Sequence, residues 1–314
     1  MNTPQSYSFP RYLASKKSID DRALNRTVWH ALASRLPADS SEQPLRVLEV
    51  GAGIGTMIER VLEWGLLPGP AHYTALDARP DNIQQAGDRL PAWGQAQGWQ
   101  IEVCPPSGWR FERSGQQITI ATETIDLFDF ITREAGTHPW DLLIAHAFLD
   151  LMDISFTLPQ LFHLLRPGGL FYFTLNFDGV TVLEPAIDPL LDGQIESLYH
   201  QTMDERLTRG RSSGDSRTGR HLFSRLVDAG AQILAAGSSD WVVFPHSEGT
   251  QPGYPEDEAY FLHFILHTIG QALAGHPKLD SRRFAGWLAQ RHNQVERGEL
   301  VYIAHQLDFA GTIP

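Results

Sequence analysis

The segment LRVLEVGAGIGTMIERVLEWG, residues 45–65, constrains the fold of this chain more than any other part of the sequence. Its apolar run Arg46–Val50 predicts a short buried strand, and the apolar spacing within Ile54–Trp64 predicts a helix. Between the two elements stand three alternating glycines, Gly51, Gly53 and Gly55. Because glycine lets the backbone come close to a ligand, such a strand–turn–helix unit is typical of α/β proteins that bind a nucleotide at this turn.

The alternation of strands and helices continues along the first half of the chain. We expect further strands at His72–Leu76, Trp109–Arg113, Gln117–Thr122, Asp141–His146 and Leu170–Leu175, and a hairpin turn at Ser114-Gly115. We expect helices from Pro80 onward, where proline suits the first turn, and at Leu158–Leu165. Strands that alternate with helices connect through right-handed crossovers. The pattern therefore predicts an α/β fold with a doubly wound, mostly parallel, seven-stranded sheet.

The second half of the chain contains longer helical segments. The expected elements are helix Leu190–Leu207, polar loop Arg209–Gly219, helix His221–Ala229, strand region Gln232–Phe244, helices Glu256–Ala274 and Ser281–Glu296, and strand Leu300–Leu307. Two helices between the last two strands predict a helical cap. At the other end, a helix at Ala14–Leu36 and a polar linker at Pro37–Pro44 precede the first strand. We therefore expect an N-terminal helical lid (1–44), a core with the glycine turn (45–180), and a part that completes the sheet and supplies the cap (181–314).

Composition and charge limit the partners of the protein. The 314 residues carry a formal net charge of −12, which disfavours nucleic acid and anionic membranes, since both require a positive surface. No run of about eighteen apolar residues predicts a membrane helix. The single cysteine, Cys104, rules out an internal disulfide and a cysteine-based zinc site. We expect a cytoplasmic protein that binds neither nucleic acid nor membrane; a homodimer and a monomer are both compatible with the sequence.

Two residues near the glycine turn indicate which nucleotide it binds. The dinucleotide fingerprint G-x-G-x-x-G requires a third glycine where Thr56 stands. Glu49, just before the turn, would be an unfavourable neighbour for a pyrophosphate at the helix N-terminus. S-adenosylmethionine carries a sulfonium and an ammonium group and no phosphate, so an acid at this position suits it better. An NAD(P)-dependent oxidoreductase is therefore the disfavoured alternative.

Five sequence elements, in order, resemble those of class I S-adenosylmethionine-dependent methyltransferases. They are EVGAGIG at residues 49–55, Asp77 at the end of the second strand, the acidic turn Asp126-Leu127, the strand WDLLIAHAF, and the segment LLRPGGLFYFTL. The resemblance covers about residues 45–176. It implies a Rossmann-like fold, S-adenosyl-L-methionine as cofactor, and methyl transfer to an O, N or C atom of a small-molecule acceptor. Since one fold hosts many functions, a non-catalytic cofactor-binding protein with the methyltransferase fold is a second alternative.

The resemblance also implies a set of cofactor-binding residues. They are Glu49, Gly51, Gly53, Gly55, Asp77, Asp126, Leu127, Ala145 and His146. The glycine turn would pack under the methionine and ribose portions, and Asp77 would accept both ribose hydroxyls.

The remaining roles concern the adenine and the methyl group. Asp126 would accept the adenine amine, with Glu123 and Asp129 as alternatives. The end of the fourth strand, Ala145 and His146, would line the methionine portion and the point of methyl transfer.

Methyl transfer from a sulfonium depends mainly on the alignment of the reacting atoms. A general base is required only when the acceptor carries a proton that it does not lose unaided. His146 is the candidate base because imidazole titrates near neutrality, and Asp150 follows on the next turn. The alternative is that His146 only packs beside the cofactor.

Candidate acceptor-binding residues come from three parts of the chain. Tyr12 lies in the N-terminal segment and Asn176 at the end of the fifth strand. Arg217 and Arg220 belong to a group of five arginines in a polar segment, and guanidinium groups bind carboxylates and phosphates in a bidentate manner. This group predicts an anionic acceptor, with a solvated loop as the alternative.

His263 and His267 have a spacing that metal sites use, but no third ligand accompanies them in the sequence. We expect an interior or surface pair of histidines and no metal.

Overall fold

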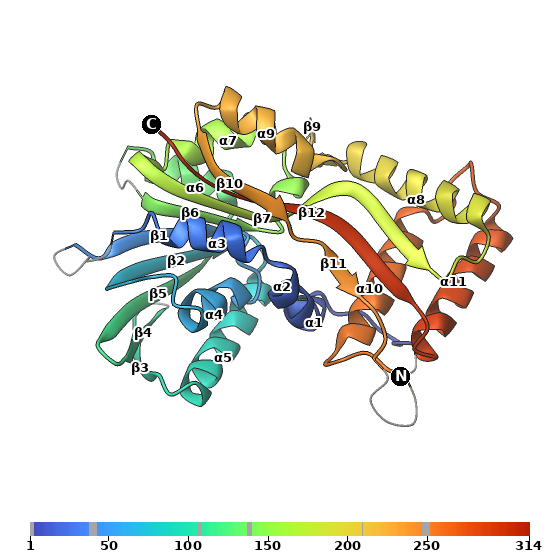
Figure 1. The fold of residues 1–314 in the computed structure, drawn as a ribbon, viewed down its shortest axis with the longest axis horizontal. Helices are drawn as coiled ribbons and strands as arrows, with labels where there is room; N and C mark the ends of the chain where they lie inside the picture. Colours follow the sequence, from blue (N-terminus) through green and yellow to red (C-terminus); the bar gives the residue numbers. More distant parts are fainter. Residues whose placement is uncertain (1–2, 38–42, 106–107, 137–139, 209, 247–251) are drawn as a thin grey trace.

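The computed structural model of the protein describes residues 3–37, 43–105, 108–136, 140–208, 210–246 and 252–314. Arg209 and part of the predicted linker Pro37–Pro44 lie outside the described residues. Figure 1 shows a twisted central sheet flanked by helices, with a further group of helices at one end. In the described part of the chain, no helix has both the length and the apolar character needed to span a lipid bilayer.

Seven strands make up the predicted, mostly parallel sheet. They are β1 (Leu45–Val50), β2 (Ala71–Asp77), β5 (Gln116–Thr124), β6 (Trp140–His146), β7 (Leu165–Glu184), β10 (Gln232–Ser238) and β12 (Val301–Thr312). Their order is β5-β2-β1-β6-β7-β12-β10, and β12 alone runs against the other described strands of this set. The chain leaves β1 toward β2 and later returns on the other side at β6. The carboxyl ends of β1 and β6 are therefore the topological switch point of the sheet.

Three further strands bring the sheet to ten among the described residues: β3 (Gln100–Cys104), β4 (Gly108–Arg113) and β11 (Trp241–Val243). β3 and β4 extend the sheet antiparallel beyond β5. The sequence analysis does not predict β3, a short edge strand whose Val103 is 72% exposed. The hairpin between β4 and β5 turns at Ser114 and Gly115, as predicted, and both residues have positive φ.

The predicted strand region Gln232–Phe244 is divided into β10 and β11. Asp240 lies between them, and its carboxylate accepts hydrogen bonds from the Ser238 hydroxyl and from the backbone N–H of Gln306 on β12. Both strands then pair with β12.

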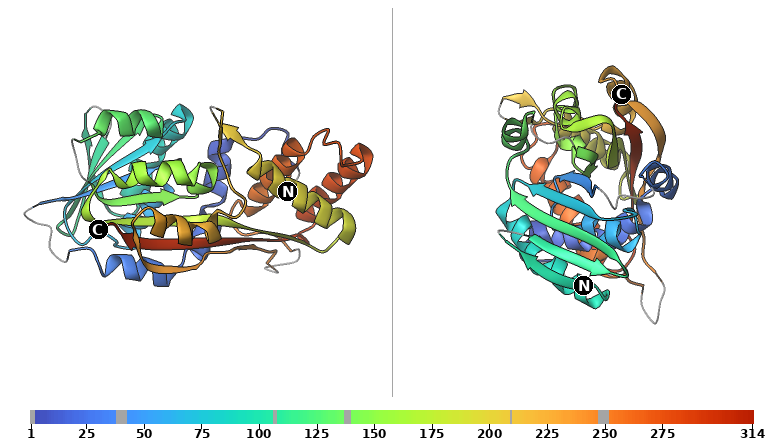
Figure 2. Two further views of the ribbon diagram at one scale, coloured as in Figure 1. Left: turned by 90° about the horizontal axis from the view of Figure 1, so that it is seen from above. Right: turned by 90° about the vertical axis from the view of Figure 1, so that its left-hand side faces the viewer.

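Helices cover both faces of the sheet and form two apolar cores (Figure 2). One face carries α3 (Arg26–Ala33), α4 (Thr56–Glu63) and α5 (Pro80–Ala96), and the other carries α6 (Leu127–Glu134), α7 (Ile154–Phe162) and α9 (Thr218–Asp228). Successive side chains of a strand point to opposite faces, so Val47 of β1 belongs to the first core and Leu48 to the second.

The prediction of one N-terminal helix over Ala14–Leu36 is wrong. The segment forms three short helices, α1 (Phe9–Ser15), α2 (Lys17–Ala23) and α3. Leu24 has an extended ψ of 126°, which ends α2. Asn25 then begins α3, because its side chain accepts hydrogen bonds from the backbone N–H groups of Thr27 and Val28.

The strands β7 and β12 extend past the rest of the sheet as a long antiparallel pair (Figure 1). Their register runs from Leu170 opposite Thr312 to Glu184 opposite Val301, so both strands are longer than predicted. Three helices gather at the far end of this pair: α8 (Pro189–Asp204), α10 (Glu258–Ala272) and α11 (Ser281–Glu296). As predicted, α10 and α11 are inserted before the last strand.

Candidate active site

A cavity of about 830 Å³ opens at the carboxyl ends of β1 and β6. One part, which we call the turn half, is lined by α1, the glycine turn and the segments that follow β2, β5 and β6. The other part, the cap half, is lined by residues of β7, α8, β11, α10 and β12. Ligands of open α/β sheets bind at this place, and the volume lies within the range of about 300–1,000 Å³ usual for small-molecule sites.

Gly51 and Gly53 of the turn line the cavity, with φ values of 68° and 57°. A Cβ atom on Gly51 would lie 2.3 Å from Cδ2 of Phe148, which also lines the cavity. Glycine at this position therefore lets the turn and the segment after β6 approach each other. Gly55 is different: it precedes α4, a Cβ there would meet Leu90 at 3.1 Å, and it does not line the cavity.

Asp77 ends β2 and faces the turn half. Its Oδ2 accepts from the backbone N–H of Gly53 at 2.8 Å, and its Oδ1 accepts from Arg79 N at 2.8 Å and from Asn82 Nδ2 at 3.1 Å. A carboxylate offers about four acceptor sites, so these three bonds fix its orientation and leave capacity for a ligand.

The three candidates for the adenine contact differ in whether they line the cavity. Asp126 lines the cavity with Leu127, and it caps α6 by accepting from the backbone N–H of Phe128 at 2.9 Å. Glu123 instead forms an ion pair with Arg133, and neither Glu123 nor Asp129 lines the cavity. Among the described residues, Asp126 is the one of the three that a ligand in the turn half can reach.

Glu49 does not line the cavity. Its carboxyl group is buried and accepts a hydrogen bond of 2.8 Å from the hydroxyl of Tyr73 on β2. Burial raises the pKa of Glu49 to about 8, although the bond from Tyr73 favours the ionised form. The predicted direct contribution of Glu49 to a cationic ligand is therefore wrong, and so is the argument against a pyrophosphate that rested on its charge.

A buried polar cluster underlies the cavity around Asp20 of α2, whose side chain is fully buried. Its Oδ2 lies 2.7 Å from Lys16 Nζ and 3.4 Å from Nη2 of Arg60 on α4. Its Oδ1 accepts from the indole N–H of Trp241 at 2.9 Å. Burial raises the pKa of Asp20, but the charge of Lys16, the contact with His146 and the charge of Arg60 together hold it below its usual range. We call these four residues, together with His146, the Asp20 cluster; it joins the N-terminal helices to the sheet and to β11.

His146, at the end of β6, lines the cavity as predicted, but both of its ring nitrogens have partners. Nε2 lies 3.1 Å from Oδ2 of Asp20, and Nδ1 lies 2.8 Å from the hydroxyl of Thr174. Nε2 also lies 3.2 Å from Nη1 of Arg60. A carboxylate only accepts and a guanidinium only donates, so Nε2 bonds either to Asp20 as a donor or to Arg60 as an acceptor, and the Thr174 hydroxyl can complement Nδ1 in both tautomers. Burial lowers the pKa of His146 to about 4. Ala145 before it is buried in the sheet and does not line the cavity.

Asp150 lies in the 3₁₀ turn Leu149–Leu151 and faces the same cavity. Its Oδ1 is buried and has no hydrogen-bond partner among the described residues. Burial raises the pKa of Asp150 to about 6, against the opposing attraction of Arg206, another lining residue. Asp150 therefore has a carboxylate oxygen without a hydrogen-bond partner among the described residues, whereas both ring nitrogens of His146 have partners.

Aromatic side chains form much of the wall of the cap half. Those that line the cavity there are Phe177, Tyr199, Trp241, Phe264 and Tyr302, and Tyr12 of α1 adjoins them from the turn half. Tyr12 was predicted from its place in the N-terminal segment, and it stacks on Phe264 with ring centroids 4.2 Å apart. The contact places α1 against α10 over the cavity.

Two predicted acceptor residues do not reach the cavity. Asn176 is buried in β7 and donates from Nδ2 to the carbonyl of Leu307. Arg220 forms an ion pair of 2.8 Å with Asp178, and its backbone N–H donates to the same carboxylate oxygen. Asp178 and Arg220 thus bond to each other, and neither lines the cavity.

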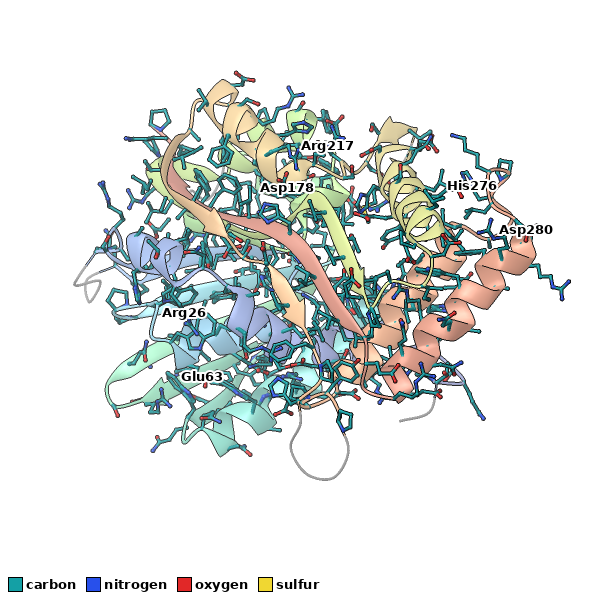
Figure 3. The ribbon with its side chains drawn as sticks, turned by 45° about the vertical axis from the view of Figure 1, so that its right-hand side comes forward. Arg26, Glu63, Asp178, Arg217, His276 and Asp280 are labelled. Atoms are coloured by element: carbon teal, nitrogen blue, oxygen red, sulfur yellow. The ribbon has the colours of Figure 1, made fainter. Side chains whose placement is uncertain are left out.

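Arg217 lies near Asp178 at the start of α9 (Figure 3). It lines a second, adjoining cavity and not the main one. Of the arginines in the predicted group whose side chains are described, Arg206 is the one that lines the main cavity. Among the arginines of this group whose side chains are described, only Arg206 is therefore placed to contact a ligand in the main cavity.

Asp20 and Arg60 were not predicted from the sequence. Asp20 and Arg60 fall in charged helical segments that read as solvated surface, and no local pattern marks their burial. Lys16 and Asp20 are four residues apart, so helical spacing could have predicted their ion pair. It could not have predicted the other contacts of Asp20.

The described residues contain no group of three histidine, cysteine or acidic side chains arranged to hold a metal ion. His263 bonds through Nδ1 to Nδ1 of His292 on α11, at 2.8 Å. His267 stacks on Tyr7, with ring centroids 4.0 Å apart.

Comparison with known proteins gives partial similarities. No family model matches the chain. The 3-methylorcinaldehyde synthase of Phoma sp is 36% identical over 78 residues, a match that covers 24% of this chain and 3% of the synthase.

Two solved structures of methyltransferases are similar over nearly the whole chain. Phosphoethanolamine N-methyltransferase 2 of Haemonchus contortus, in complex with phosphomonomethylethanolamine and S-adenosylhomocysteine, has a TM-score of 0.43 and 10% identity, over 99% of this chain and 59% of that one. The plantazolicin methyltransferase BpumL, in complex with S-adenosylhomocysteine, has a TM-score of 0.41 and 13% identity, over 98% of this chain and 92% of that one. The chain therefore spans less than two thirds of the synthase and of the Haemonchus contortus enzyme.

Proposed function

We propose that the protein is an S-adenosylmethionine-dependent methyltransferase that acts on a small-molecule acceptor. The observation that carries the proposal is the meeting of four motif residues on the turn half of one cavity: Gly51, Gly53, Asp77 and Asp126. They follow three different strands, and the motif resemblance assigned all four to the same ligand. The cap half, which adjoins them, leaves space for an acceptor.

The charges around the cavity support a cationic cofactor over a dinucleotide. Five carboxylates line it, Asp77, Asp126, Asp150, Asp153 and Asp215, against three basic side chains, Lys16, Arg79 and Arg206. An excess of carboxylates disfavours a pyrophosphate and suits a ligand that carries a sulfonium and an ammonium group.

Each lining residue has a role that its geometry permits. Asp77, held by three hydrogen bonds, would accept the ribose hydroxyls, and Asp126 would accept the adenine amine. Gly51 and Gly53 leave room for the methionine portion. S-adenosylmethionine, when bound, supplies the methyl group on an activated sulfonium.

Asp150 is the proposed general base for an acceptor that carries a proton. Its buried Oδ1 has no partner among the described residues, and a pKa of about 6 makes it ionised and moderately basic at neutral pH. His146 would act as a positioning residue, because its nitrogens bond to Asp20 and Thr174 and hold the end of β6 in place.

Calorimetric titration tests the cofactor. S-adenosylmethionine and S-adenosylhomocysteine should bind to the wild type, and NAD should give no heat. Asp77→Asn should weaken binding by about 1–3 kcal/mol, because a charge-assisted acceptor becomes neutral. Glu123→Gln is the matched control, since Glu123 lies outside the cavity. Tighter binding of NAD than of S-adenosylmethionine would refute the proposal.

Activity is tested separately with S-adenosylmethionine labelled at the methyl group and a panel of phenols, carboxylic acids and phosphate esters. Transfer of label to an acceptor, lost in Asp150→Asn, is the expected result. Cofactor binding without transfer to any member of a broad panel would favour the non-catalytic alternative.

A further inference from the structure

The main cavity continues into a second one of about 510 Å³, which we call the vestibule. The two share four lining residues, Met152, Asp153, Ser212 and Asp215. The vestibule lies between the start of α7, the short strand β9 (Arg211–Ser212) and the first turns of α9. The two cavities therefore adjoin, and a molecule bound beside the four shared residues can extend from one cavity into the other.

Two guanidinium groups of the vestibule have no internal partner. Arg217 and Arg225 both line it, and neither side chain makes a hydrogen bond or an ion pair with any described residue. Arg217 packs with its Cγ against Gly179, where a Cβ atom would lie at 3.2 Å. Both residues lie on or next to α9, an element already tied to β7 by the Asp178–Arg220 ion pair.

The carboxylates of the vestibule, in contrast, already hold hydrogen-bond donors. Asp204 accepts from the backbone N–H and the hydroxyl of Ser216. Asp215 accepts from Arg217 N and from Nδ1 of His221, which must donate because a carboxylate only accepts. Asp153 accepts from the backbone N–H of Phe156. The three carboxylates therefore already accept hydrogen bonds from the protein, whereas the side chains of Arg217 and Arg225 donate none to a described residue.

We propose that Arg217 and Arg225 bind an anionic group, a carboxylate or a phosphate ester, that the methyl acceptor carries. The apolar or aromatic part of the same molecule would lie in the cap half, whose wall is largely aromatic. Guanidinium groups suit this task because they bind both oxyanions in a bidentate manner. That the bound molecule is a methyl acceptor rests on the proposed function. The binding of an anion by the two arginines does not depend on methyl transfer.

Binding of small probes tests the site. Phenyl phosphate, benzoate and the uncharged benzyl alcohol are titrated into the wild type by ligand-observed NMR at low salt. At least one of the two anions should bind about tenfold more tightly than benzyl alcohol, and its binding should weaken as salt rises, since charges near solvent are screened. Preference for phenyl phosphate indicates a phosphate ester, and preference for benzoate indicates a carboxylate.

The double variant Arg217→Gln, Arg225→Gln should reduce binding of the preferred anion about tenfold. Arg282→Gln is the matched control, because Arg282 is an exposed arginine of α11 outside both cavities. S-adenosylmethionine is titrated into the same three proteins, so failure of the cofactor site shows up independently of the anion site. Equal binding of the anions and benzyl alcohol, or an unchanged double variant with native circular dichroism, would overturn the proposal.

Discussion

Nε2 of His146 lies 3.1 Å from Oδ2 of Asp20, a residue of the second helix that stands 126 positions earlier in the chain. The contact ties the end of β6, at the switch point of the sheet, to the N-terminal helices that cover the cavity. It also explains why His146 is a poor general base: Nδ1 bonds to Thr174, and Nε2 lies between Asp20 and Arg60.

Asp20→Asn should destabilise the protein by about 3–5 kcal/mol, because Lys16 would remain buried without its counter-charge and Arg60 would keep only its ion pair with Asp21. Urea denaturation followed by circular dichroism measures the change. Asp81→Asn, at an exposed ion pair with Arg79, is the control and should change stability by less than about 0.5 kcal/mol. Equal stability of the two variants would mean that the cluster contributes little.

The turn half was predictable because its residues follow directly from strand ends. A carboxylate or a glycine that comes just after a buried strand of a parallel sheet must lie at the crevice, whatever the rest of the fold does. Asp77, Asp126 and the turn at Gly51–Gly53 are of this kind. That Asp126 lines the cavity, whereas Glu123 and Asp129 do not, required the structure, because it depends on where α6 begins.

The parts that could not be predicted depend on which way a side chain points. All residues of β1 from Val47 to Val50 are buried, so no alternation in the sequence reveals that Glu49 turns toward Tyr73 and away from the crevice. The arginine group fails for a related reason. Of its members with described side chains, Arg206 faces the main cavity, Arg217 faces the second cavity, and Arg220 bonds to Asp178.

Glu49→Gln should leave the affinity for S-adenosylmethionine within about twofold of the wild type, because the side chain does not reach the cavity. Its pKa of about 8 exceeds the ordinary value of 4.5, so the folded state holds the proton more tightly and the wild type loses stability as pH rises between these values. The variant cannot ionise and should therefore gain stability relative to the wild type from pH 5 to pH 8. Thermal melts across this range measure the difference, and a gap that narrows with rising pH would contradict the assignment.

Gly51→Ala should weaken cofactor binding strongly, because the new methyl group would lie 2.3 Å from Cδ2 of Phe148 and force the turn or the ring to move. Gly65→Ala is a matched control: Gly65 has a similar φ of 64° but open space around its missing Cβ. Both variants should lose about 1–2 kcal/mol of stability from the left-handed backbone. Only the first should lose affinity in a calorimetric titration. Comparable affinities in the two variants would show that the turn does not need its close contact with Phe148.

The pH dependence of activity distinguishes Asp150 from His146 as the general base. Asp150 can take a proton only when it is ionised, and His146 only when it is neutral. The value of kcat should therefore rise with pH through about 6 if Asp150 is the base, and through about 4 if His146 is the base. Asp150→Asn should lower kcat by about 100-fold or more and remove the inflection near pH 6.

The same substitution should raise the melting temperature at pH 8, where the buried carboxylate is charged, and change it little at pH 4. His146→Gln serves as the comparison, since it should keep the inflection while losing stability through the Asp20 cluster. An inflection near pH 6 that persists in Asp150→Asn, measured with an acceptor found in the labelling assay, would assign proton removal to another group.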